Sequence, residues 1–452
     1  MSARWPSEDV DPAPLGQPLH FTFSGRTAPN RFLKSAMTER LSSFHPTDLP
    51  ARGVPSSNYV NLYRRWGEGQ IGLMLSGNIQ IEYDHLEAAG NAIITKNEKF
   101  EGERFERFKE AASEGKKHGS LFVGQVSHPG RQVPDTVQEH PISASDIQLH
   151  GSVIGLTFAK PRAATLEDIQ NIVNGFAHAA LYLEKAGFDG IQLHGAHGYL
   201  IAQFLAQTTN KRTDQYGGSL TNRTRIIVEI AQAIRKATSP SFILGIKLNS
   251  QEFQEGGLQV EEAKEVCRIL EENTFDFVEL SGGTYEALGW TYKRESTRKR
   301  EAFFIEFAEK IVPALSKTRV YVTGGFKTAW AMVKALETVD AVGLARTLCQ
   351  EPRLCRDILS GKVKGAIQQR FDINDIGASN LGAGALLRHI SKDYEPVDLS
   401  SEEEMAAFQK DVTAWQKAQG GQVEGGASLR GRKDGAIYWF PDLSAATPYV
   451  EA

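Results

Sequence analysis

Eight short apolar segments, each followed by a stretch with helical periodicity, are the feature that most restricts how this chain can fold. The segments are nearly continuous apolar runs rather than alternations, which is typical of parallel strands that are covered on both faces. The predicted strands are residues 30–36, 71–78, 121–127, 190–196, 242–249, 277–283, 319–325 and 341–348. Eight strand–helix units predict an α/β fold, a (β/α)8 or TIM barrel, with an open doubly wound sheet as the alternative.

The stretch at residues 165–187 shows why the segments between the strands are interpreted as helices. Its apolar residues recur every three or four positions, Thr165 and Asp168 form a capping-box pattern, and Gly187 stands where a left-handed C-cap belongs. Cys267 falls in the apolar stripe of another such segment, so we interpret it as a small core residue rather than a nucleophile.

Two regions do not fit the repeating pattern. Residues 128–166 form the main insertion, after the third predicted strand, and are expected to make a small cap over the mouth of the barrel. After about residue 390 the composition shifts to Glu, Gln, Gly and Ala. We therefore divide the chain into a barrel domain, residues 1–390, and a C-terminal extension, residues 391–452, to which the sequence assigns no function.

Composition excludes several classes of protein. The formal net charge is −4, which gives no reason to expect nucleic acid or an anionic membrane as a partner. The three cysteines form no CxxC pair, which argues against a disulfide scaffold, a structural zinc module or an iron–sulfur cluster. No stretch approaches the ~20 apolar residues of a membrane-spanning helix, and the polar N-terminal segment does not resemble a signal peptide. A cytoplasmic location is expected.

The fourth predicted strand carries the strongest chemical signal. It ends in His194, His197 and Tyr199, at the edge of a barrel where active sites lie. Two imidazoles and a phenol suit a site that polarises a carbonyl group and delivers a proton. Histidines with structural hydrogen bonds are an equally good interpretation. A metal site is a weaker interpretation of the two histidines, because this segment holds no Asp or Glu to complete a ligand set. We therefore expect no metal.

Residues that follow the seventh and eighth predicted strands, and one residue within the fifth, indicate an anion-binding site. Glycines follow the seventh strand at Gly324 and Gly325, and Arg346 follows the eighth, which is where barrels commonly bind phosphate. Tight turns beside a surface arginine, with no phosphate bound, would have the same sequence pattern. Lys247 is a cation within an apolar strand, so it either faces an anion at the rim or extends its ammonium group to solvent.

Over roughly residues 15–360 the chain resembles the Old Yellow Enzyme family of FMN-dependent ene-reductases, which are (β/α)8 barrels. The segment LHGAHGYLIAQFL followed by TNKRTDQYGGSLTNRTRI is close to a family signature. The segments NRFLKSAMTER, GLMLSGNI, FVGQVSHPGRQ, TGGF and VGLAR occur in the family's order.

The resemblance implies a set of FMN-binding residues. Thr38 would lie near the O4/N5 edge of the flavin, Gln125 would bind the pyrimidine edge, and Lys247, where many relatives have Arg, would lie near N1/O2. Ala345 stands where many relatives have Gly, and a negative φ there would preserve phosphate binding by the backbone. The full implied cofactor-binding set is Ala36, Met37, Thr38, Gly77, Asn78, Gln125, Lys247, Gly324, Gly325, Ala345 and Arg346.

The resemblance also implies a reaction. His194 and His197 would hold the carbonyl oxygen of an α,β-unsaturated substrate, or the amide of NAD(P)H, and Tyr199 would donate a proton in a ping-pong cycle. Arg40 stands where some relatives have a substrate-contacting tyrosine, so it either favours a polar substrate or points to solvent. The alternatives are another FMN barrel reaction, such as an NADH oxidase or a biosynthetic isomerase or oxidase, a metal-dependent hydrolase, and a ligand-binding barrel without catalysis. The expected partners are NAD(P)H and a small enone-type molecule, and the chain could form a homodimer.

Overall fold

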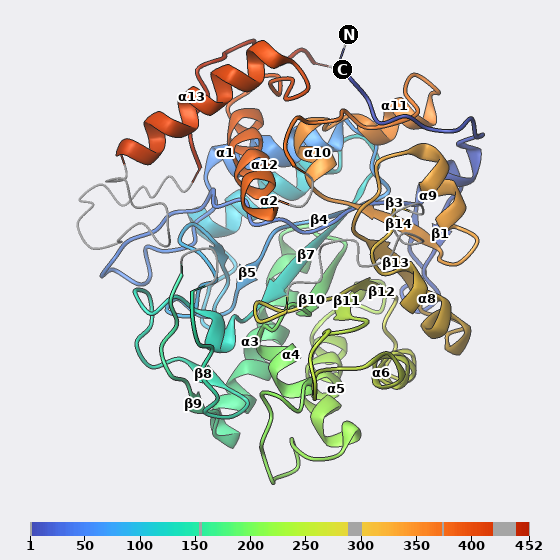
Figure 1. Ribbon diagram of the computed structural model, residues 1–452. Coiled ribbons are helices and arrows are strands. Elements are labelled where there is room, and N and C mark those ends of the chain that lie inside the picture. The colour runs from blue at the N-terminus through green and yellow to red at the C-terminus, as the bar shows by residue number, and fades with distance from the viewer. Residues whose placement is uncertain (1, 153–155, 288–300, 373–374, 419–439, 452) are drawn as a thin grey trace.

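The computed structural model describes residues 2–152, 156–287, 301–372, 375–418 and 440–451. Eight parallel strands form a closed ring at its centre (Figure 1). The ring follows the order β10-β11-β12-β13-β14-β3-β4-β7, and a parallel pairing of β7 with β10 closes it. The (β/α)8 barrel predicted from the sequence is confirmed, and the open doubly wound sheet is excluded.

All eight predicted strands occur, although most are shorter than the apolar runs. The barrel strands are β3 (Phe32–Lys34), β4 (Leu73–Leu75), β7 (Leu121–Ser127), β10 (Gly190–Gly195), β11 (Ile243–Asn249), β12 (Phe277–Ser281), β13 (Arg319–Thr323) and β14 (Ala341–Leu344). Two short strands, β5 (Ile79–Gln80) and β6 (Ala92–Ile93), extend the sheet beside β7, and an N-terminal hairpin pairs β1 (Leu19–His20) with β2 (Thr27–Ala28).

One or two helices follow each barrel strand. They are α1 (Ser57–Gly67), α2 (Glu103–Gly115), α3 (Leu166–Lys185), α4 (Leu200–Leu205), α5 (Leu220–Ala237), α6 (Val260–Glu272), α8 (Ile305–Ile311), α9 (Ala329–Ala335), α10 (Arg346–Gln350) and α11 (Leu354–Leu359). Short 3-10 helices span Ala13–Gly16, Gly130–Gln132 and Val312–Ala314. The predicted capping box opens α3, where the Thr165 hydroxyl accepts from the Asp168 amide. Cys267 lies on the buried face of α6, in the core, as predicted.

The inside of the barrel changes from apolar to polar along the strands. Near the strand beginnings, Leu33, Val123, Phe277 and Tyr321 form a buried cluster with Phe21 next to the N-terminal hairpin. In several of these strands, the next side chain on the same face, two residues further along, is polar. The apolar layer fills one end of the barrel. The polar layer lies toward the carboxyl ends of the strands, where the active sites of such barrels lie.

The insertion after the third barrel strand forms a separate small sheet. Its strands β8 (Ile142–Ser143) and β9 (Arg162–Ala163) pair in parallel and lie beside α4 at one edge of the molecule (Figure 1). Phe158 of this insertion approaches the ring of Tyr285, which follows β12, with 6.2 Å between ring centroids. The insertion therefore contributes to the wall of the barrel mouth.

The C-terminal part folds back onto the barrel. Helix α12 (Ile376–Ser391) packs against α1 and α10, and α13 (Glu402–Ala418) lies at the outer edge of the same side (Figure 1). The Arg388 guanidinium binds both carboxylate oxygens of Asp442 at 2.6 and 3.0 Å, which ties the last residues to α12. Helix α12 crosses the predicted boundary at residue 390, so the division into two domains stays a prediction.

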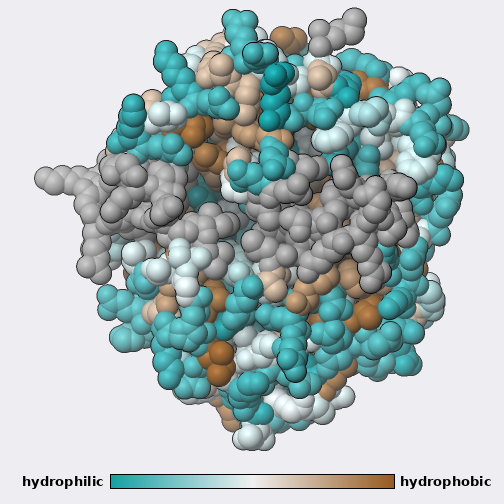
Figure 2. Space-filling model, viewed as in Figure 1, coloured by the Kyte–Doolittle hydropathy of each residue, from teal (hydrophilic) through white to brown (hydrophobic). Residues whose placement is uncertain are grey.

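The surface in this view is predominantly hydrophilic, with hydrophobic residues in small groups (Figure 2). Within the described residues, no helix combines the length and the hydropathy needed to cross a membrane.

Candidate active site

A buried polar network connects four neighbouring strands inside the barrel. The Gln125 amide of β7 donates to Gln192 of β10 at 2.7 Å, and Gln192 donates to Glu279 of β12 at 2.8 Å. Lys247 of β11 binds the other oxygen of Glu279 at 3.0 Å. The strand register explains the cluster, because it places Gln125 beside Gln192 and Lys247 beside Glu279. Gln125 and Lys247, predicted from sequence to share a site, thus lie in one network.

Glu279 is the anion that the sequence analysis missed. Burial would raise the pKa of its carboxyl, but Lys247 and hydrogen bonds from Thr323 and Gln192 hold that pKa below its usual value. Lys247 is therefore paired inside the barrel and does not extend to solvent. The sequence does show a charged residue, Glu279, within the apolar run FVELS. Its pairing with Lys247 could not be predicted, because that depends on the register between β11 and β12.

His194, His197 and Tyr199 gather at the end of β10. His194 Nε2 lies 3.3 Å from His197 Nδ1, and His197 Nε2 lies 2.9 Å from the hydroxyl of Ser281 at the end of β12. The Tyr199 ring stands against the His194 ring with 4.5 Å between centroids. His197 has a φ of 58°, in the left-handed region that is unusual outside glycine, which suits a residue held for function.

Burial determines the protonation of this group. It lowers the pKa of both imidazoles well below the usual value, with His197 and Lys247 adding to the effect on His194, so both rings are neutral near pH 7. Burial also raises the pKa of Tyr199 well above its usual value, and the neighbouring Tyr285 adds to this. The Tyr199 hydroxyl lies 2.9 Å from that of Tyr285, a residue the sequence analysis did not select.

A second carboxylate, Glu87, lies beside the predicted flavin edge. It accepts hydrogen bonds from the Thr38 hydroxyl at 3.1 and 3.2 Å and from the Asn78 amide at 3.3 Å. Asn78 in turn contacts His194 Nδ1 through its oxygen at 2.8 Å. Glu87 stands in a loop without periodicity, so no sequence pattern distinguished it from a surface carboxylate.

Arg40 turns toward the site. Its guanidinium lies 4.8 Å from the ring centroid of Phe440, in the C-terminal segment. Burial lowers the pKa of Arg40, whereas Glu87, Tyr285 and Tyr199 are near enough to raise it. Arg40 is therefore partly buried and lies near Glu87 and the two tyrosines, and its contact with substrate stays a prediction.

The remaining residues of the predicted flavin set line the turns after β3 and β4. Met37 contacts the Cys349 thiol at 3.4 Å, and the neighbouring Ala36 packs against the barrel's interior cluster. The Gly77 amide donates to Glu39 at 2.6 Å. A Cβ at Gly77 would lie 2.1 Å from that carboxylate, so only glycine fits here.

The predicted phosphate-binding turns lie across the barrel from the histidines. Strand β14 is four places from β10 in the ring of eight. Gly324 and Gly325 have φ values of 124° and 98°, a conformation that glycine alone adopts readily. Ala345 has a φ of −124°, so alanine is tolerated there. Arg346 donates to the Ser379 hydroxyl of α12 at 2.5 Å, which brings the C-terminal region to this turn.

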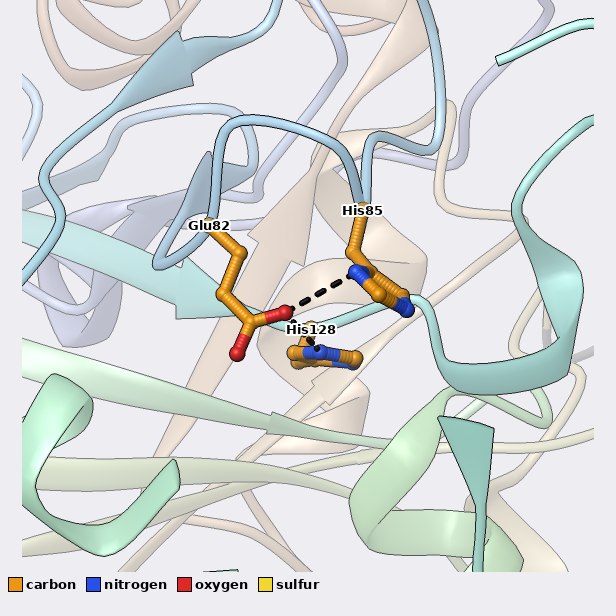
Figure 3. A group of neighbouring side chains, drawn as sticks. All are labelled: Glu82, His85 and His128. Atoms are coloured by element: carbon orange, nitrogen blue, oxygen red, sulfur yellow. Dashed lines mark hydrogen bonds and ion pairs between the residues drawn. The ribbon is translucent and has the colours of Figure 1, made fainter. Parts of the chain in front are cut away.

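A separate cluster joins Glu82, His85 and His128, whose side chains converge in Figure 3. Glu82 Oε2 lies 2.9 Å from His85 Nδ1 and 3.2 Å from His128 Nε2. These distances suit a metal centre, but the Gly130 amide donates to His128 Nδ1 at 3.0 Å. The neutral His128 ring must then carry its hydrogen on Nε2, facing Glu82. The cluster is best described as a hydrogen-bonded ion pair rather than a metal site.

The closed barrel, its buried polar layer, the glycine turn after β13 and Arg346 after β14 fit the class of barrel enzymes that bind a phosphate-bearing ligand. A family model described as "NADH:flavin oxidoreductase / NADH oxidase family" matches residues 14–364. The chain is 50% identical over 410 residues to an "NADH-dependent flavin oxidoreductase nadA" of Aspergillus parasiticus, covering 90% of this chain and 92% of that protein. The chain belongs to this family, the Old Yellow Enzymes, and is an NAD(P)H-dependent FMN oxidoreductase.

Solved structures agree on the fold. The Old Yellow Enzyme homologue from Zymomonas mobilis aligns with a TM-score of 0.64 at 20% identity, covering 81% of this chain and 98% of the homologue. Morphinone reductase in complex with tetrahydroNAD aligns with a TM-score of 0.63 at 23% identity, covering 78% and 92%.

The residues present fit FMN. The turns predicted to bind phosphate have an arginine and two glycines with positive φ. The Gln125 amide and the Lys247 ammonium group lie on strands two to four places away around the ring. FMN is an elongated anion with a polar ring system. It needs a turn that binds its phosphate and hydrogen-bonding groups around its ring, and these residues offer both.

Proposed function

We propose that this enzyme reduces the C=C bond of α,β-unsaturated carbonyl compounds with NAD(P)H. The observation that carries the proposal is the Tyr199 ring against His194, the neighbour of His197, with a raised pKa that keeps the Tyr199 phenol protonated. A hydrogen-bond donor for a carbonyl and a proton donor next to it are what the reduction of a polarised alkene requires.

We assign the cofactor contacts to the residues selected from sequence. Gly324, Gly325, Ala345 and Arg346 would hold the FMN phosphate. Ala36, Met37, Thr38, Gly77, Asn78, Gln125 and Lys247 would surround the ring. When bound, FMN would supply the hydride chemistry that links NAD(P)H to the β-carbon of the alkene.

The chain's own residues complete the reaction. His197 would donate its Nδ1 hydrogen to the substrate carbonyl, which draws electrons from the double bond and stabilises the enolate that hydride addition creates. Tyr199 would then give its proton to the α-carbon, so that one hydride and one proton saturate the bond. Tyr285 supports this step, because its hydroxyl can donate to the oxygen of the Tyr199 phenolate.

Both half-reactions would use the pocket beside the histidine pair. NAD(P)H must leave before the alkene enters, which gives ping-pong kinetics. Arg40 would line the same pocket and favour a polar or acidic substrate, since its guanidinium faces Glu87 and the two tyrosines.

The test is a matrix of anaerobic initial rates with NADH and cyclohex-2-enone. Parallel lines in a double-reciprocal plot, with cyclohexanone as product, support the proposal. Intersecting lines contradict the ping-pong scheme, and the absence of cyclohexanone contradicts the reaction.

The family description also favours a second candidate, an NADH oxidase that passes electrons to oxygen. NADH consumption in air, with and without cyclohex-2-enone, distinguishes the two. A rate that the enone does not change, with no saturated ketone formed, indicates an oxidase. The cytoplasmic location and the homodimer stay predictions, to be tested by cell fractionation and size-exclusion chromatography.

A further inference from the structure

Glu39 joins the two turns that carry Thr38 and Asn78. It directly follows Thr38 in the chain, and its carboxylate accepts from the amide of Gly77, the residue before Asn78, at 2.6 Å. The Tyr63 hydroxyl of α1 donates to the same carboxylate and accepts from the Gly77 amide at 3.1 Å. The turn after β3 and the turn after β4 are therefore hydrogen-bonded to each other through one side chain.

The two turns also touch directly at Gly77. A Cβ at this position would collide with the carbonyl oxygen of Met37 as well as with the Glu39 carboxylate. Only glycine lets the backbone of one turn approach the other so closely. The contact at Gly77 and the hydrogen bond to Glu39 together define the distance between the turns.

Glu39 is a buried carboxylate with a buried cation near it. Lys34 is fully buried, donates to the last carbonyl group of β4 at 2.7 Å and lies 4.1 Å from the ring centroid of Trp66. Burial raises the pKa of Glu39, while Lys34 and the hydrogen bonds from Tyr63 and Gly77 oppose this. Apolar side chains of the same volume often stabilise a core as well as such a pair does. The presence of Glu39 thus indicates a role in fixing the turns rather than in filling the core.

We propose that Glu39 is a positioning residue for the flavin ring, because it holds the turn after β3 against the turn after β4 and so sets the spacing of Thr38 and Asn78 around that ring. The inference rests on the proposed assignment of Thr38 and Asn78 to the ring. It predicts that loss of Glu39 weakens binding of the ring and leaves the phosphate contacts unchanged, since these are assigned to the turns after β13 and β14.

Titration of the apoprotein with FMN and with riboflavin tests this role. Glu39→Ala removes the acceptor for the Gly77 amide and the Tyr63 hydroxyl. The affinity for both flavins should therefore fall by the same factor, at least about tenfold. Unchanged affinity for both flavins overturns the proposal. A loss for FMN alone also overturns it, because that result places the effect at the phosphate.

Glu39→Gln separates positioning from charge. Its amide oxygen can still accept from the Gly77 amide and the Tyr63 hydroxyl, so the affinity for both flavins should stay within about threefold of the wild type. The visible circular dichroism of bound FMN, which reports the surroundings of the ring, should keep its wild-type shape in Glu39→Gln and change in Glu39→Ala. A Glu39→Gln protein that loses flavin affinity as Glu39→Ala does contradicts positioning by hydrogen bonds.

Asp189 provides the matched control. It is a buried carboxylate that accepts from a backbone amide, that of Phe122 at 2.9 Å, but it precedes β10 and so lies at the other end of the barrel. Asp189→Ala should lower the free energy of unfolding, measured by urea denaturation, and bind both flavins like the wild type. Equal losses of flavin affinity in Asp189→Ala and Glu39→Ala would show general destabilisation and overturn the proposal. A wild-type enzyme that binds FMN but reduces no alkene counts against the proposed function and leaves this result standing.

Discussion

Glu279 is the buried carboxylate at the centre of the polar network inside the barrel. It neutralises the buried ammonium group of Lys247 and accepts from Gln192 and Thr323. A buried charge is tolerated only when it is paired and hydrogen-bonded. The amide side chains around Glu279 thus keep fixed positions in the centre of the barrel.

Replacing Glu279 with Gln should destabilise the fold strongly, because it leaves Lys247 as an unpaired buried cation. The expected loss is about 3–5 kcal/mol in the free energy of unfolding, measured by urea denaturation. Glu265→Gln is the matched control, since its partner Arg268 is on the surface, and it should cost less than about 1 kcal/mol. A similar small loss for both variants would show that the internal pair contributes little.

Tyr199→Phe should separate the two halves of the proposed reaction. The variant keeps the aromatic ring against His194 but lacks the proton, so NADH should still bleach the flavin while reoxidation by cyclohex-2-enone slows by roughly 10²–10⁴-fold. Stopped-flow absorbance measures both steps. Tyr285→Phe serves as the control, with a smaller effect expected because Tyr285 only supports the phenol. Unchanged reoxidation in Tyr199→Phe would remove Tyr199 from the proton-donating role.

Among the elements, the turn between β14 and α10 links the barrel to the C-terminal region. Arg346 opens α10 and donates to Ser379 of α12. Helix α12 is itself held by the contact of Arg388 with Asp442. The packing of the C-terminal region thereby supports the turn to which the phosphate contact is assigned.

Arg346→Ala should therefore weaken FMN binding without weakening riboflavin binding. The loss of a charge-assisted contact to phosphate is expected to lower the affinity for FMN by about ten- to a hundredfold. Fluorescence titration of the apoprotein with FMN and with riboflavin measures the difference. An equal loss for both flavins would indicate that Arg346 contacts the ring or only maintains the turn.

The loop after β5 carries the pH dependence that the structure predicts most clearly. Burial alone would lower the pKa of His85, but Asp84 and Glu82 raise it to about 9. Figure 3 shows Glu82 beside His85. The folded-state pKa lies above the unfolded value, so the stabilisation is fully present below about pH 6.5 and is lost as the pH rises through about 9.

His85→Gln tests this dependence. The difference in unfolding free energy between the wild type and the variant should shrink by up to about 3 kcal/mol between pH 6 and pH 9.5. Urea denaturation at the two pH values measures it. A difference that is independent of pH would mean that His85 is neutral in the folded protein.

For the whole molecule, the sequence predicted the architecture because strands covered on both faces leave long apolar runs. It also predicted that Gln125, Lys247 and His194 lie near one another, because polar residues near the ends of such runs fall at one end of a barrel, while their roles stay predictions. It did not predict Glu279, whose role depends on the register between β11 and β12. Glu87 and Tyr285 stand in loops, where tertiary contacts rather than periodicity decide position.

The most direct test of the account is the absorbance spectrum of the purified protein. The account predicts flavin bands that bleach when NADH or NADPH is added without oxygen and return when cyclohex-2-enone follows. A colourless protein that does not take up FMN, or a bound flavin that neither nicotinamide bleaches, would contradict it.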